Sequence, residues 1–317
     1  MKEVKVLLAL LVLLLGVAYW SNSEEDGPRV VKSVSVFETD ASNITGLRLV
    51  TKTQTVSMSF RQDDKKASYP WFRIETKSST RAFVGNDKVE KLLKKYANFE
   101  AIRSLGSDFD SERLSKLKFD SPARKLTIQL KSGERKFELG GRTHGARDHY
   151  LRSVGGKEVF LVAKKLIADF ESPESQLTLR KIMKLSMEDV AAVVVTAKEK
   201  SQKILRQNRL SAKDAFWAAS AAPDERNETL GNYVDKALKL TARKYGPKES
   251  PLPQGDLLFS MRWEDDSGKT LDTIRLFKSD EKRVSYLVQS EATHVPVEVS
   301  RTIGEQLERD LAVILGL

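Results

Sequence analysis

The sequence predicts an α+β fold of two tandem repeats, each a mostly antiparallel sheet with two or three helices, behind an N-terminal transmembrane helix. Three observations support this prediction: an apolar run near the N-terminus, matching segments in the two halves of the chain, and series of short alternating strands with few helices. Strands that follow one another closely along a chain usually pair antiparallel. We therefore divide the chain into residues 1–26, 27–185 and 186–317.

The apolar run covers residues 6–20, with Lys2 and Lys5 before it and an acidic segment at 24–26 after it. It is shorter than the ~20 residues that usually span a bilayer, but an aromatic end suits the membrane interface. We interpret it as an uncleaved signal anchor. A cleaved signal peptide is the alternative, although aromatic residues spoil its small-residue cleavage site. The expected anchor residues are Val6, Leu7, Leu8, Leu10, Leu11, Leu13, Leu14, Leu15 and Trp20.

Composition limits the function classes. The chain has 317 residues, no cysteine and a net charge of +10. The absence of cysteine excludes disulfides, thiolate metal sites and cysteine nucleophiles. A basic excess favours anionic partners. The charges are dispersed and accompany no nucleic-acid-binding motif, so we expect no nucleic-acid partner.

Matching segments indicate an internal duplication. Leu47 and Val193 are separated by the same number of residues as Trp71 and Trp217. The separation is smaller for Tyr150 and Tyr286, as a deletion in the second copy would produce. A repeat of this length suggests that one folding unit occurs twice.

Apolar periodicity predicts the elements of each copy. The first copy should contain strands at 44–50, 55–60, 70–74, 126–130, 136–139, 150–153 and 158–162, with helices at 87–98 and 163–170. The second should contain strands at 257–263, 270–277 and 283–289, and a final helix at 299–315.

No catalytic signature is present. The chain has no G-x-S-x-G, H-E-x-x-H, Walker A or G-x-G-x-x-G motif. His144, Asp148 and His149 could ligate a metal, but Arg142 and Arg147 in the same loop oppose a cation. We predict a polar turn there, no metal, no cofactor and no enzymatic activity.

Two tryptophans and the same two arginines are the candidate ligand or partner surface. Trp71 and Trp217 could stack on a sugar ring, but aromatic residues at matching places in two repeats more often fill the core. We therefore expect both to be core residues. Arg142 and Arg147 complete the candidate surface.

The order of these features resembles a bacterial family of domains of unknown function. The residues that carry the resemblance are Trp71, 89–93, 117–123, Leu139-Gly140 and 150–152. The resemblance implies single-pass periplasmic proteins, often encoded beside gliding-motility-type ABC transporter components. It implies no catalytic residues.

We therefore expect a non-catalytic envelope accessory protein, a partner of an ABC-type transporter or of a gliding or export complex. It should lie at the inner (cytoplasmic) membrane, single-pass, with most of the chain periplasmic. Its partners should be the membrane, transporter subunits or other envelope proteins, and an anionic envelope polymer. A periplasmic binding module for an anionic polymer or small solute is the alternative, followed by an envelope hydrolase.

Overall fold

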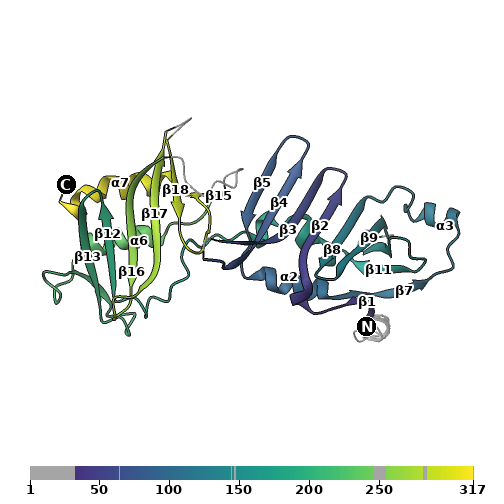
Figure 1. The fold of residues 1–317 in the computed structure, drawn as a ribbon, viewed down its shortest axis with the longest axis horizontal. Coiled ribbons are helices and arrows are strands. Elements are labelled where there is room, and N and C mark those ends of the chain that lie inside the picture. Colours follow the sequence, from purple (N-terminus) through teal and green to yellow (C-terminus); the bar gives the residue numbers. More distant parts are fainter. Residues whose placement is uncertain are drawn as a thin grey trace, which may run out of the picture.

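The chain folds into two lobes, which lie side by side in Figure 1. The computed structural model describes residues 33–63, 65–143, 145, 148–245, 255–280 and 284–316. We call 33–177 the first lobe, 192–316 the second lobe and 178–191 the linker.

Strands dominate both lobes. Of the described residues, 46% lie in strands and 21% in helices. The predicted α+β class is therefore wrong, and the protein is mainly β, with antiparallel sheets of two, nine and eight strands. The prediction missed strands whose apolar alternation is weak, such as residues 200–207, because lateral pairing rather than pattern holds them in the sheet.

The first lobe contains the nine-stranded sheet, in the order β5-β4-β3-β2-β8-β9-β10-β11-β7, and the two-stranded sheet β1-β6. Its strands are β1 (Val34–Glu38), β2 (Ile44–Thr51), β3 (Gln54–Gln62), β4 (Ser68–Thr76), β5 (Thr80–Val84), β6 (Asn98–Ala101), β7 (Arg103–Gly106), β8 (Arg124–Leu130), β9 (Gly133–Arg142), β10 (Asp148–Ser153) and β11 (Val159–Ala163).

Helices cover one face of this sheet, which we call the helix face. Phe72 of β4 packs against Phe170 of α4, with ring centroids 6.2 Å apart, and Tyr96 of α2 also contacts Phe170. The core of the lobe therefore lies between the sheet and these helices. The helices are η1 (Ala41–Asn43), α2 (Lys88–Ala97), α3 (Ser111–Lys116), α4 (Lys164–Glu171) and α5 (Glu174–Leu177).

The second lobe has an eight-stranded sheet in the order β14-β13-β12-β16-β17-β18-β19-β15. Tyr233 of α6 packs against Phe259 of β16, so α6 lies on the helix face of this sheet. The elements are β12 (Ala192–Ala197), β13 (Lys200–Gln207), β14 (Phe216–Ala219), α6 (Glu228–Leu238), β15 (Lys244–Tyr245), β16 (Asp256–Glu264), β17 (Thr270–Ser279), β18 (Ser285–Gln289), β19 (Val297–Glu298) and α7 (Arg301–Leu315).

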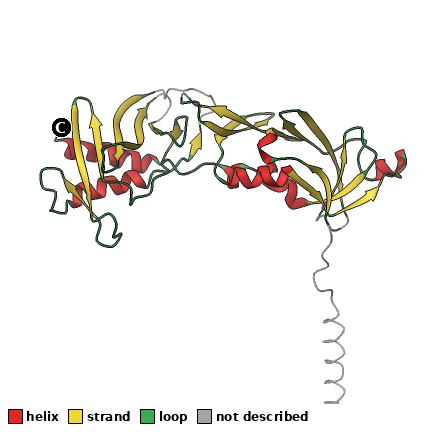
Figure 2. Ribbon diagram, turned by 60° about the horizontal axis from the view of Figure 1, so that its bottom comes forward, coloured by secondary structure: helices red, strands yellow, loops and turns green. Residues whose placement is uncertain are grey.

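The two large sheets share one strand order. Setting β5 aside, the order β4-β3-β2-β8-β9-β10-β11-β7 corresponds position by position to the order in the second lobe. In each lobe the long helix, α2 or α6, precedes the central hairpin of the sheet, which is β8–β9 in the first lobe and β16–β17 in the second. Figure 2 shows helices and strands in both lobes.

The predicted membrane anchor, residues 6–20, lies outside the described residues. Within the part of the chain that the structure describes, no helix combines the length and the apolar character needed to cross a membrane.

Candidate functional site

The structure does not bring the predicted surface residues together. Trp71 lies in β4 and Trp217 in β14 of the other lobe. Arg142, at the exposed end of β9, is separated from β4 by β8, β2 and β3. Arg147 lies outside the described residues.

Trp71 lies on the face of its sheet that is opposite to the helices. It pairs with Ser59, whereas the adjacent Met58 pairs with the core residue Leu47. Paired residues of antiparallel strands share a face and neighbouring residues alternate. Trp71 is nevertheless only 2% exposed, and the guanidinium carbon of Arg61 lies 4.6 Å from its ring centroid.

Trp217 lies on the helix side of its sheet, whereas Trp71 lies on the other side of its own. The predicted equivalence of the two tryptophans is therefore wrong. Trp217 pairs with Arg206, which shares a face with Ile204 and its partner Val193. That is the helix face of the second lobe. A one-residue difference in strand register accounts for the change, because such a shift reverses the face of every side chain. Both tryptophans are buried, but only Trp217 packs beneath a helix.

The side of the nine-stranded sheet opposite to the helix face, which we call the open face, has a row of donors on paired residues. The row runs across β4, β3, β2, β8 and β9 through Arg73, Ser57, Arg48, Thr127 and Lys136. Cations thus alternate with hydroxyls on successive strands. Adjacent strands lie ~4.8 Å apart, so neighbouring cations in the row are ~10 Å apart.

Acidic side chains neutralise only part of the positive charge of this row. Arg73 pairs with Glu75 at 2.9 Å, and Lys136 pairs with Glu134. Both ion pairs link residues two apart on one strand at half-exposed positions, where such pairs contribute little. Arg48, in the centre of the row, has no ion-pair partner among the described residues and is exposed.

The corresponding row of the second lobe is neutralised by a buried acid. It runs through Lys203, Val194, Arg262 and Thr273. Glu264 pairs with Lys203 at 3.0 Å and with Arg262 at 2.8 Å, and its side chain is only 7% exposed. Burial opposes ionisation of Glu264, but hydrogen bonds from the two cations outweigh it and lower the pKa of this carboxyl.

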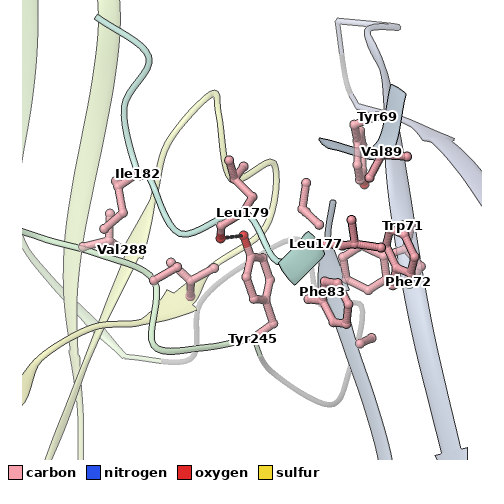
Figure 3. Packing of buried hydrophobic residues seen from close by; sticks show 14 of the residues in the cluster. Tyr69, Trp71, Phe72, Phe83, Val89, Leu177, Leu179, Ile182, Tyr245 and Val288 are labelled. Atoms are coloured by element: carbon pink, nitrogen blue, oxygen red, sulfur yellow. Dashed lines mark hydrogen bonds between the residues drawn. The ribbon is translucent and has the colours of Figure 1, made fainter. Parts of the chain in front are cut away.

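A strap formed by residues 178–182 of the linker joins the lobes (Figure 3). On the first-lobe side, the Leu179 N–H donates to the Val84 carbonyl at 2.8 Å. On the second-lobe side, the Tyr245 hydroxyl donates to the Leu179 carbonyl, also at 2.8 Å. The strap therefore covers the edge of β5 while it is tied to the second lobe.

A second contact, which we call the clasp, joins the β3–β4 turn to the loop after β18. The imidazole of His294 stacks on Tyr69 with centroids 4.1 Å apart and planes at 5°. Its Nδ1 lies 3.1 Å from Asp63 Oδ2, and Lys65 pairs with Glu291 at 2.5 Å. Sequence analysis missed this site because its members are far apart in the chain and form no local motif.

Burial shifts the pKa values of His294, in the clasp, and of Asp272, near it. Burial lowers the pKa of His294, although Asp63 partly opposes this effect. Near Glu291 of the clasp, Asp272 is 4% exposed, and its carboxylate accepts the Thr273 N–H at 2.7 Å. Burial, with a smaller contribution from Glu291, raises the pKa of Asp272 to about 6.

His149 is the described histidine of the predicted polar turn. His149 is 2% exposed, and burial with nearby Arg124 and Arg142 lowers its pKa. His144 lies outside the described residues. Among the residues that the structure describes, no three His, Cys, Asp or Glu side chains gather as metal ligands.

A cleft of about 440 Å³ lies between α7 and the β17–β18 hairpin. Four of its five charged residues pair with one another: Lys278 binds Glu308 at 2.8 Å, and Arg301 binds Glu305 at 2.7 Å. The Tyr286 hydroxyl donates to Glu308 at 2.5 Å. The cleft therefore offers fewer uncompensated donors than the open face, which we take as the candidate site. The lining residues are Lys278, Val284, Tyr286, Arg301, Glu305, Glu308 and Arg309.

Comparison with known proteins identifies a family and no function. Neither a curated protein nor a solved structure gives a significant match to the chain. The family model described as domain of unknown function (DUF4340) matches residues 76–255, which run from the end of β4 to the start of the central hairpin of the second lobe. Since this match covers more than half of the chain, the protein belongs to the DUF4340 family.

Proposed function

We propose that this protein is a non-catalytic accessory subunit of an ABC-type transporter or export complex in the cell envelope, and that it acts by binding. The observation that carries the proposal is the open face. One side of the nine-stranded sheet packs the core, whereas the other presents a row of charged and hydroxyl groups. A polar sheet face suits docking of a large partner better than enclosure of a small substrate.

The partnership with a transporter rests on the resemblance to periplasmic proteins encoded beside ABC transporter components. The proposed location is the outer side of the cytoplasmic membrane. The basic residues before the apolar run 6–20 and the acidic ones after it support this orientation. Protease added to intact spheroplasts should then digest the lobes, and digestion only after lysis would contradict the location.

Affinity purification of the full-length protein from mild detergent tests the partnership. We expect membrane permease subunits to co-purify. A photo-crosslinking residue at Ser57, on the open face, reports whether that face contacts a partner. The same residue at Lys91, exposed on α2, is the matched control. Recovery of no membrane protein under any mild condition would refute the accessory role.

A further inference from the structure

The open face has the chemistry of a track for a linear anionic chain. Its row places Arg73, Arg48 and Lys136 at every second strand, with Ser57 and Thr127 between them. Cations ~10 Å apart cannot converge on one small anion. They can each meet a different anionic group of one extended chain, and the hydroxyls can donate to the groups between.

The geometry favours phosphate groups over other anions. A guanidinium presents a planar fork that binds phosphate oxygens in a bidentate manner. Every phosphate of a chain exposes oxygens, so both the cations and the intervening hydroxyls find acceptors. An extended acidic peptide would present apolar or amide groups to some of these donors.

The face lacks the platform that a nucleic acid would need. Single-stranded nucleic acids bind by stacking bases on exposed aromatic rings as well as by phosphate contacts. Trp71 lies beside the row, but it is 2% exposed and Arg61 covers its ring. The row itself contains no aromatic residue.

We propose that the open face of the first lobe binds a linear chain of phosphate groups, which lies across β4, β3, β2, β8 and β9. This inference rests on the proposed function only in that the protein acts by binding, and it does not require a transporter partner. The bound chain would lie perpendicular to the strands and contact Arg73, Arg48 and Lys136 in turn.

The test measures binding of fluorescently end-labelled inorganic polyphosphate to the full-length protein. We expect the triple variant Arg48→Gln, Arg73→Gln, Lys136→Gln to bind about tenfold or more weakly, because three surface ion contacts are lost. The dependence of log K on log salt should become shallower by about 2. Circular dichroism confirms that the variant is folded.

The matched control is a variant that loses the same number of positive charges on the helix side of the first lobe. Lys91, Lys164 and Lys165 are exposed and have no ion pair among the described residues. Their triple change to Gln should leave polyphosphate affinity within about twofold. Equal weakening by both triples would show that only net charge matters, and would overturn the proposal.

Two other linear polyanions test whether the bound chain is a chain of phosphate groups. Poly-glutamate and single-stranded DNA should both bind more weakly than polyphosphate at equal charge concentration. Tighter binding of either would overturn the assignment to a phosphate chain. Loss of polyphosphate binding with permease co-purification intact would refute this inference alone. Loss of permease co-purification with polyphosphate binding intact would refute the transporter partnership alone.

Discussion

The first and second lobes have the same strand order but treat their uncovered sheet faces differently. In the first lobe the central row of cations stays exposed, with Arg48 unpaired among the described residues. In the second lobe Glu264 occupies the same region and binds both flanking cations. One scaffold therefore supports a face suited to anions and a face that satisfies its own charges. The difference arises from a few side chains rather than from topology.

The helix packing of the second lobe gives the largest expected effect. Gly304 of α7 lies against Tyr286, and a Cβ there would be 2.2 Å from the ring. Gly304→Ala should destabilise the protein by about 3 kcal/mol through overpacking, despite the better helix propensity of alanine. Gly231→Ala is the control, because its Cβ would meet Trp217 at an ordinary 3.5 Å. Urea denaturation should show Gly231→Ala neutral or stabilising, and equal losses would contradict this packing.

Asp272 should make stability depend on pH. Its pKa is about 6 in the folded state and 3.8 as the reference value, so the folded state binds the proton more tightly. Its contribution is therefore favourable at low pH and is lost as pH rises from about 4 to about 6, by an amount of about 3 kcal/mol. Asp272→Asn should remove this slope from urea denaturation between pH 4 and 7. An unchanged slope would show that Asp272 is not its source.

Removing Glu264 should make the side of the second-lobe sheet opposite to its helices resemble the open face of the first lobe. Glu264→Gln frees Lys203 and Arg262 from a nearly buried partner. Polyphosphate affinity should rise about threefold, as one further site gains net positive charge. Glu298→Gln, a charge-matched change at β19, should have less effect. An increase of the same size in the control would show that the row is irrelevant.

The clasp should contribute less to stability than Gly304 or Asp272. His294 has a lowered pKa in the folded state, so its protonation opposes closure. The clasp contribution is present above the unperturbed pKa of 6.5 and is lost as pH falls below it. His294→Ala should cost about 1 kcal/mol and widen the distribution of distances between spin labels on the two lobes. If the pH dependence of these distances is the same in the variant, His294 is not the titrating group.

The sequence predicted individual strands better than their alignment. Alternation located β2 through Leu47 and Leu49, and helical spacing located α2. The match of Tyr150 with Tyr286 was wrong, because Leu151 is buried beside Leu139 whereas Tyr286 itself is buried. A longer turn between β16 and β17 than between β8 and β9 shifts the register, and periodicity alone does not measure turn length.

Features that depend on contacts between distant parts of the chain could not be predicted from the sequence pattern. The row of Arg73, Arg48 and Lys136 depends on which strands are neighbours, and no local motif records that order. The clasp likewise depends on a contact between Asp63 and His294, which are 231 residues apart. Local periodicity predicts elements, while lateral order and lobe contacts come from tertiary packing.

The strap also makes the two lobes share one stretch of backbone. Leu179 completes the edge of β5, whereas the carbonyl of Ile182 accepts the Ser290 hydroxyl at 2.5 Å. If the chain were divided on either side of this stretch, one of the two lobes would lose a hydrogen-bond partner. Separating the lobes would expose an unpaired strand edge, which invites aggregation. Their independence as folding units is therefore lower than two distinct sheets would suggest.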